Sequence, residues 1–386
     1  RPPRSTLFPY TTLFRSIRVL ECVANMDRSG AETMLLNYYR HFDKDKVQLD
    51  FLCSKKKPGA YDDEIESMGS RLFYAPSMNP LKFFAYVRKM KALYKEHPEW
   101  KIVHSHTSAL GWYPLFAAKC AGVPVRIVHM HNFRIPMDKK WPIRQFCKSQ
   151  LRNVANHLWG CGIAANTFYY GEKSVKNGEA VVINNAIELD KFRFNSVVRN
   201  RIRKDFGLEG KIVIGHIGRF IALKNQSLLV DILAELKKEN DQYCLALLGD
   251  GPMMDEIREK ARSLGLEKDI VMPGNIGNAN EWYQAFDIFM LPSTTEGLPV
   301  VGVEAQAADL PCIFSANITK EIGLLSSSKY LSLEEPVSVW AKTVSSLIAS
   351  HHERVDRSED IRKAGYDIEI EARKLQDMYI ELEKQI

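Results

Sequence analysis

Hydrophobic positions along the chain form short continuous runs that alternate with longer stretches of mixed polarity. From Ile17 onward, runs rich in Val, Ile, Leu and Phe are followed by segments whose apolar residues recur at helical spacing. Strands buried on both faces read as continuous apolar runs, and parallel strands are joined by crossover helices. The alternation therefore predicts an α/β fold built on parallel sheets.

The expected strands fall into two series. The first series comprises residues 17–24, 47–53, 71–75, 101–106, 125–131, 157–165 and 180–186, and the second comprises residues 211–220, 243–251, 269–274, 287–292 and 311–315. Two series predict two doubly wound sheets, since 386 residues exceed what one hydrophobic core usually organises. We place the first domain at residues 17–190 and the second at residues 191–363, with a charged connector over residues 187–207.

Residues 1–16 do not fit this alternation. They contain Pro near the start, show no period, and include PYTTLFRS, which resembles the translation of a sequencing adapter. We therefore expect residues 1–16 to be an extraneous, disordered leader. No run in the sequence approaches the ~18 uncharged apolar residues of a membrane-spanning helix, so any membrane contact is expected to be peripheral.

Charge is distributed unevenly along the sequence. The formal net charge is +8 over residues 17–190 and −5 over residues 191–386. A basic half suits anionic lipid, nucleic acid or phosphorylated substrates, and charge alone does not choose among them. The seven cysteines are scattered without a C-x-x-C pair, which argues against a disulfide framework or a zinc site and favours a reducing cytoplasm.

The segment PSTTEGLPVVGVEAQAADLP (292–311) is the most specific signal for chemistry. Glu296 and Glu304 follow an apolar strand, and Gly297 and Pro299 open the helix that carries Glu304. Ionised carboxylates accept hydrogen bonds from sugar or ribose hydroxyls. On one continuous helix the two carboxylates would be ~12 Å apart, too far for a glycosidase pair, so one near a sugar and one near a nucleoside fits better. The alternative is two solvated glutamates on a helix face.

A second signal is GHIGRFIALKNQSLLVDIL (215–233), where a strand is followed by a short loop and a helix. Arg219 offers a bidentate guanidinium and Lys224 a point charge, and we expect Asn225 to cap the helix. Cations placed there neutralise a diphosphate without a metal. Alone they would be ordinary surface residues, but on the same sheet as Glu296 and Glu304 they predict a phosphate site.

A third, weaker signal follows the first strand. Gly30, in Ser29-Gly30-Ala31-Glu32, permits close approach of a ligand to the backbone at a helix start. The chain contains neither G-x-G-x-x-G nor G-x-x-x-x-G-K-[ST], which excludes a nicotinamide fingerprint and a P-loop.

Histidines occur in two pairs at strand ends, His104 with His106 and His129 with His131. Alternation along a strand places each pair on one face. Since no further ligand follows at zinc spacing, we expect no metal. A strand-end histidine is better suited to bind a sugar or to stabilise charge on a leaving phosphate. The alternative is a histidine hydrogen-bonded to a loop carbonyl.

Taken in this order, the segments resemble the retaining glycosyltransferases of family 4, in particular their capsular and exopolysaccharide branch. The likeness extends from about Ile17 to the end of the chain, and three phrases carry it: VINNAIELDKF (182–192), LLGDGPMMDEIREKARSLGL (247–266) and NANEWYQAFDIFMLPSTTEGLPVVGVEAQ (278–306). The resemblance implies the GT-B fold, with two facing Rossmann-like domains and a cleft between them. It also implies a nucleotide-sugar donor, with UDP the expected nucleotide, on the second domain and a glycan or lipid-linked acceptor mainly on the first.

The resemblance further implies retention of anomeric configuration by front-face attack, with no covalent nucleophile, metal or other cofactor. Glu296 and His131 would be the catalytic residues, and Glu304 would bind the ribose. The expected diphosphate-binding residues are Arg219, Lys224 and Gly30, and those expected to support the donor loops are Gly218, Gly297, Leu298 and Pro299.

The chain departs from the family pattern at three places. Ser29-Gly30 replaces a glycine pair, Asn185-Ala186-Ile187-Glu188 replaces Asn-Gly-Ile-Asp, and Asp309 stands where Gly usually ends a helix. Two other classes stay open: a sugar-nucleotide epimerase of the same architecture, which needs additional acid–base carboxylates, and a non-catalytic nucleotide-sugar-binding protein. Nucleic-acid binding lacks a recognisable sequence signature, so no nucleic-acid partner is expected.

A last helix is expected over residues 364–385, and the resemblance implies that it crosses back to the first domain. Its apolar residues recur at helical spacing and predict one buried face made of Ile370, Leu375, Met378, Tyr379 and Leu382.

Residues 81–95 and 134–152 both mix aromatic with basic side chains. We expect them to dock a cytoplasmic, peripheral protein on the anionic inner face of the cell membrane, where it meets a lipid-linked acceptor. The alternative is a helical stripe that packs on the sheet, made of Phe83, Tyr86, Val87, Met90 and Tyr94.

Overall fold

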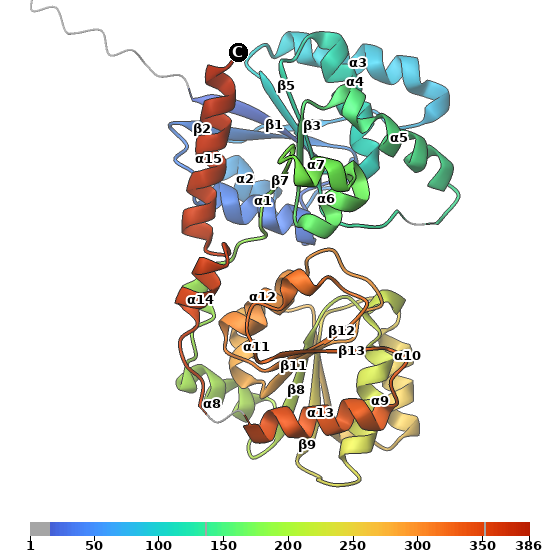
Figure 1. Cartoon of the computed structure of the whole chain (residues 1–386), viewed down its shortest axis with the longest axis vertical. Coiled ribbons are helices and arrows are strands. Elements are labelled where there is room, and N and C mark those ends of the chain that lie inside the picture. The colour runs from blue at the N-terminus through green and yellow to red at the C-terminus, as the bar shows by residue number, and fades with distance from the viewer. Residues whose placement is uncertain (1–15, 136, 351–352) are drawn as a thin grey trace, which may run out of the picture. The chain divides into compact units, whose positions relative to one another are not determined.

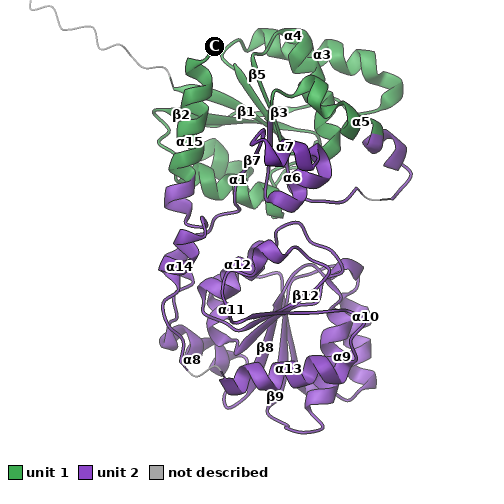
Figure 2. Ribbon diagram, in the orientation of Figure 1, with its two compact units in different colours: residues 1–128, 146–157, 372–386 green, residues 129–145, 158–371 purple. Residues whose placement is uncertain are grey.

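The computed structural model describes residues 16–135, 137–350 and 353–386 (Figure 1). The chain divides into two compact units (Figure 2). The first contains the described residues up to Val128, together with Phe146–His157 and Ala372–Ile386, and the second contains His129–Gln145 and Leu158–Glu371. The leader predicted over residues 1–16 lies outside the described residues except for Ser16.

Seven strands form the first sheet, in the order β3-β2-β1-β4-β5-β6-β7. Their bounds are β1 Ile17–Val23, β2 Val47–Cys53, β3 Leu72–Tyr74, β4 Ile102–Ser105, β5 Val125–Met130, β6 His157–Gly160 and β7 Ala180–Val182. The helices along these residues are α1 Gly30–Arg40, α2 Asp62–Ser67, α3 Phe83–Glu96, α4 Trp112–Ala121, α5 Trp141–Val154, α6 Ile163–Tyr170 and α7 Glu172–Lys176. The central strand β1 pairs in parallel with both neighbours, with Val19 opposite Leu49 of β2 and Ile102 of β4.

Six strands form the second sheet, in the order β10-β9-β8-β11-β12-β13. Their bounds are β8 Ile212–Ile217, β9 Tyr243–Leu248, β10 Ile270–Gly274, β11 Ile288–Leu291, β12 Cys312–Ser315 and β13 Ser328–Leu331. The helices are α8 Ser196–Asp205, α9 Gln226–Leu236, α10 Met254–Ser263, α11 Ala279–Ala285, α12 Val300–Ala307, α13 Val337–Ser350, α14 Ser358–Lys363 and α15 Ile368–Lys384. Every residue of β9 is buried, as expected for an apolar strand covered on both faces.

The predicted α/β class with two parallel sheets is confirmed, but several details of the strand prediction are wrong; the strand expected over residues 180–186, for example, ends at Val182. The strand expected over residues 157–165 ends at Gly160, and α6 begins at Ile163 after the extended Gly162. A short run of small apolar residues occurs both in strands and at the start of helices, so the pattern alone does not show where the strand ends. Strand β13 was not predicted, because it is a partly exposed edge strand with few apolar residues.

Helix α15 packs its residues from Ala372 onward within the first unit (Figures 1 and 2). Leu375 and Tyr379 are buried as the helical spacing predicted. Ile370 was assigned to the same face, but this residue is 38% exposed. The buried face of α15 is made of residues 372, 375, 376 and 379. Ile370 precedes Ala372 by two residues, which turns the helix by about 200°, so the Ile370 side chain points away from that face.

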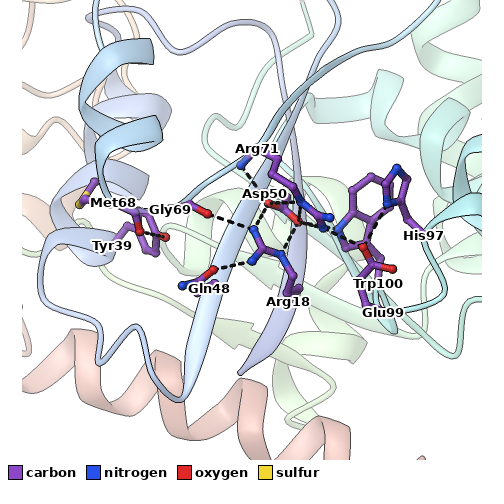
Figure 3. A network of polar contacts seen from close by, with 10 residues as sticks. All are labelled: Arg18, Tyr39, Gln48, Asp50, Met68, Gly69, Arg71, His97, Glu99 and Trp100. Atoms are coloured by element: carbon purple, nitrogen blue, oxygen red, sulfur yellow. Dashed lines mark hydrogen bonds and ion pairs between the residues drawn. The ribbon is translucent and has the colours of Figure 1, made fainter. Parts of the chain in front are cut away.

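A buried carboxylate joins the amino-terminal ends of strands in the first sheet (Figure 3). Asp50 on β2 is fully buried and accepts hydrogen bonds from Arg18 Nε at 2.8 Å, from Arg71 NH2 at 2.5 Å and from Trp100 Nε1 at 2.7 Å. Burial alone would raise the pKa of Asp50, but the hydrogen bonds from Arg18, Arg71 and Trp100 lower it to about 2. The network therefore fixes residues from four separate segments around one charge.

We predict that Asp50→Asn lowers the free energy of unfolding by about 3 kcal/mol at neutral pH, because it breaks a buried ion pair. The folded-state pKa of about 2 lies below the unfolded value near 3.9, so this stabilisation is present above pH 4 and is lost as pH falls toward 2. Urea unfolding at pH 7 and pH 3 measures both effects. The exposed pair of Lys176 and Glu172 supplies the control, since Glu172→Gln should cost under about 0.5 kcal/mol. Equal losses in both variants would contradict the role of Asp50.

Candidate functional site

Two loops at the carboxyl ends of β8 and β9 lie in backbone contact. The amide of Gly218 donates to Leu248 O and the amide of Phe220 donates to Asp250 O, each at 2.9 Å. Gly249 has φ +133°, and a Cβ there would collide with the carbonyl oxygen of Gly218. Only a glycine at this position allows the loop after β9 to approach the loop after β8 so closely.

A third loop, after β11, joins the same edge of the sheet. The amide of Thr294 donates to Leu223 O at 2.9 Å, which ties the segment before Glu296 to the loop before α9. Carboxyl ends of parallel strands meet at one edge of a sheet, where doubly wound folds bind ligands. The structure therefore gathers residues 218–225, 249–253 and 292–299 at the edge where the sequence placed the phosphate and carboxylate residues.

Lys224 and Glu296, separated by 72 positions in the sequence, form an ion pair in this loop cluster. Lys224 Nζ lies 2.6 Å from Glu296 Oε1, and Ser293 Oγ donates to the same carboxylate oxygen at 2.7 Å. The two charged side chains are 17% and 16% exposed, so the pair is largely shielded yet accessible. A Cβ at Gly218 would lie 3.3 Å from Lys224 Cδ and Cε, so the lysine side chain passes directly over this glycine.

Glu304 lies on α12, which begins at Val300 directly after Pro299 as expected. The hydroxyl of Tyr283, fully buried on α11, donates to Glu304 Oε2 at 2.6 Å. Burial raises the pKa of Glu304, and the Tyr283 hydroxyl opposes that shift. No pattern in the sequence indicates Tyr283, because 21 positions separate it from Glu304.

The remaining residues of the predicted donor site differ in exposure. Arg219 is exposed in the loop after β8, Gly297 is partly exposed, and Leu298 and Pro299 are buried. Asn225 directly precedes α9, but its side chain does not cap the helix, so that prediction is wrong. The residue adopts a left-handed conformation with φ 54°, and its Nδ2 donates to Pro292 O at 3.4 Å instead.

Gly30 belongs to the first unit, whereas the backbone of His131 lies against the loop cluster of the second unit: a Cβ at Gly297 would be 2.5 Å from His131 O. Gly30 is the first residue of α1 and is exposed, and a Cβ at this position would meet nothing within 4 Å. His131 follows β5, and its ring stacks on that of His129 with centroids 4.3 Å apart, as alternation along a strand predicts. The assigned roles of both residues stay predictions.

His104 and His106 also share one face of their strand, with ring centroids 4.1 Å apart. Both contact the buried Glu21 of β1: His106 Nε2 lies 2.9 Å from Glu21 Oε2, and the Tyr379 hydroxyl of α15 donates to Oε1 at 2.9 Å. Burial lowers the pKa of His106 to about 4, so this ring is neutral at pH 7. The sequence indicated the histidines but not their shared carboxylate.

Comparisons with known proteins show the family to which the chain belongs. Residues 28–191 match the family model "Glycosyltransferase Family 4", and residues 198–365 match "Glycosyl transferases group 1". The chain is 38% identical over 369 residues to EpsF of Bacillus subtilis (strain 168), a protein named as a glycosyltransferase, with 94% of this chain and 96% of the relative covered. It is 26% identical to the capsular polysaccharide biosynthesis glycosyltransferase CapH of Staphylococcus aureus, covering 94% and 99% of the two chains.

Solved structures support the fold. The crystal structure of Anabaena Alr3699/HepE in complex with UDP superposes with a TM-score of 0.69 at 17% identity, covering 96% of this chain and 98% of that one. Together with the EpsF match, these findings place the chain in a definite class: it belongs to the family 4 glycosyltransferases and has the GT-B fold. Within the described residues, every helix is too short or too polar to span a bilayer.

We predict that Lys224→Ala and Glu304→Gln each weaken donor binding by about 1.5–3 kcal/mol, because each removes a charged hydrogen-bonding group, Lys224 from the loop cluster and Glu304 from the helix that follows it. Isothermal titration with the nucleotide and steady-state kinetics with the nucleotide sugar measure the loss. Lys268→Ala and Glu239→Gln are matched exposed controls, placed before β10 and after the end of α9, and should change neither quantity. Near-normal donor use by Lys224→Ala or Glu304→Gln would remove the assignment of that residue.

Proposed function

We propose that the protein transfers a sugar from a UDP-sugar to a glycan or lipid-linked acceptor in capsule or exopolysaccharide synthesis, with retention of anomeric configuration and without a metal. The pairing of Lys224 with Glu296 beside the loops after β8 and β9 carries this proposal. In this pair, a cation that can bind a diphosphate lies next to a carboxylate that can accept hydrogen bonds from sugar hydroxyls. A nucleotide sugar carries a diphosphate and a sugar side by side and therefore needs both groups close together.

Each group has a distinct part in the proposed reaction. The acceptor hydroxyl oxygen bonds to the anomeric carbon on the face that the leaving diphosphate occupies, the bond from that carbon to the phosphate oxygen breaks, and the hydroxyl proton passes to the departing phosphate. Lys224 and Arg219 stabilise the negative charge that develops on the diphosphate. Glu304 holds the ribose, and Glu296 and His131 orient the transferred sugar.

The names of similar proteins support the donor and acceptor classes. The HepE structure was solved with UDP, and a further structure of the same protein contains UDP and glucose. A relative from Escherichia coli, 24% identical over 302 residues with 74% of this chain and 76% of that protein covered, is named as a galactosyltransferase that uses UDP-Gal and a diphosphoundecaprenol-linked sugar. The epimerase alternative is less favourable, because it needs carboxylates that are free to act as acid and base, and Glu296 is already paired with Lys224.

Transfer assays decide the proposed function. We expect a panel of nucleotide sugars to identify a UDP-sugar, the product to keep the anomeric configuration of the donor by NMR, and activity to persist in excess EDTA. Lys224 and Arg219 would supply the charge neutralisation that a divalent ion supplies in metal-dependent transferases. Loss of activity in EDTA that Mn²⁺ or Mg²⁺ restores would reverse the metal-free proposal, and an inverted product would reverse the stereochemical one.

The membrane proposal rests on the region around α3. Tyr86, Met90 and Tyr94 are buried, so part of the predicted stripe does pack inside the first unit. Leu81 and Phe84, in contrast, are 94% and 87% exposed. These two apolar side chains stand among exposed basic residues of the same segment, namely Lys82, Arg88, Lys89 and Lys95.

An aromatic cluster extends this exposed patch onto α4 and α5. Phe83 contacts Phe84 and stacks on Trp112, with the ring centroids of Phe83 and Trp112 5.2 Å apart. The ring of Trp112 in turn meets that of the half-exposed Phe146 edge-on, with centroids 5.6 Å apart. Such a surface inserts shallowly at a bilayer interface, while each basic residue near anionic lipid contributes roughly 1 kcal/mol. We therefore propose that this face docks on the anionic cytoplasmic surface of the cell membrane, where a lipid-linked acceptor would be met.

Sedimentation with vesicles tests the docking face. We expect binding to anionic but not neutral vesicles, weakening as salt rises, because the attraction is screened. Changing Leu81 and Phe84 to Ser should reduce binding several-fold by removing apolar burial, and changing Lys82 and Lys89 to Glu should reduce it at low salt. Val197→Ser, which removes a 76% exposed apolar side chain from α8, is the control. If neither the Leu81 and Phe84 changes nor the Lys82 and Lys89 changes reduce vesicle binding, the membrane contact lies on another part of the protein.

A further inference from the structure

His216 is a buried histidine beneath the candidate diphosphate loop to which the proposed reaction assigns no part. It lies on β8, is fully buried, and its Nδ1 is 2.9 Å from Met290 O on β11. A carbonyl oxygen only accepts hydrogen bonds, so Nδ1 carries the proton. Burial lowers the pKa of His216 to about 4, so the ring is neutral at pH 7 and Nε2 presents a lone pair.

The lone pair of His216 faces the lysine of the candidate site. A Cβ at Gly218 would lie 3.2 Å from His216 Nε2 and 3.3 Å from Lys224 Cδ and Cε. The imidazole nitrogen and the lysine stem therefore both border the space that the missing side chain of Gly218 leaves open. Among the described residues, His216 Nε2 has no hydrogen-bond partner and is shielded from solvent.

An unpaired buried acceptor is unfavourable for folding, and an apolar side chain of similar size would avoid it. His216 instead places an acceptor beside a side chain that ends in three N–H donors. In the structure, Lys224 Nζ lies 2.6 Å from Glu296 Oε1. If Glu296 turns to the hydroxyls of a bound sugar, Lys224 needs another acceptor to stay over Gly218.

We propose that His216 is a positioning residue for Lys224: in the donor-bound state, His216 Nε2 accepts a hydrogen bond from the Lys224 ammonium and holds its other N–H groups toward the diphosphate. This inference rests on the proposed donor site. It gives Lys224 a second hydrogen-bond partner, His216, in addition to Glu296. No covalent change at the imidazole is involved.

Kinetics of four variants test the proposal. His216→Leu keeps the volume but removes the acceptor, and it should raise the donor KM about tenfold, the effect of losing one hydrogen bond to a charged group. His216→Gln keeps an acceptor and should recover part of the affinity. The double variant of His216→Leu with Lys224→Ala should bind donor no worse than Lys224→Ala alone, because the two residues act in series. His157→Leu, at a partly buried histidine of β6, should leave the donor KM unchanged.

Fully additive losses in the double variant, or no rescue by His216→Gln, would overturn the positioning role while leaving the donor site in place. Full donor affinity in Lys224→Ala would overturn both. ¹⁵N NMR of the unaltered protein provides a measurement that does not depend on the variants folding. The Nε2 resonance of His216 should shift upfield on addition of UDP as it accepts a hydrogen bond, and an unchanged resonance at saturating UDP would refute the contact.

Discussion

The close approach of two backbone segments, at Gly218 and Gly249, is the constraint on which the candidate site depends. A side chain at Gly249 would collide with the Gly218 carbonyl, and one at Gly218 would press on the Lys224 stem. With glycine at both positions, the loop after β8 lies flat against the loop after β9 and carries Lys224 to Glu296. Backbone packing thus brings the two charged groups together at this edge of the sheet.

The first sheet buries two carboxylates and satisfies them in different ways. Asp50, near the amino-terminal ends of the strands, is held by two guanidinium groups and an indole. Glu21 is held by His106 and by the hydroxyl of Tyr379. The neighbouring His104 and His106 overcome the effect of burial and lower the pKa of Glu21 to about 2. Because Tyr379 comes from α15, the Glu21 network also fastens the end of the chain to the first sheet.

The sequence predicted what depends on local pattern and missed what depends on contacts between distant segments. Continuous apolar runs identified the central strands, and the spacing after them located Glu296 and Glu304 at a loop and a helix start. The partners of these carboxylates, Lys224 and Tyr283, came from elsewhere in the chain. The sequence indicates Lys224 and Glu296 separately as site residues but does not indicate that they form an ion pair. His216 gave no signal, since a histidine inside an apolar strand looks like any other core position.

Asp309 shows how a distant contact reverses a local expectation. A left-handed residue after a helix is normally glycine, and Asp309 adopts φ 51° at the end of α12 with its side chain buried. Its carboxylate accepts from the Val355 amide at 2.7 Å and from Arg357 Nε at 2.8 Å. The strain of the left-handed backbone is therefore offset by tying the chain after α13 to the end of α12. Glycine would relax the backbone but lose both contacts, so this departure from the family pattern has a structural reason.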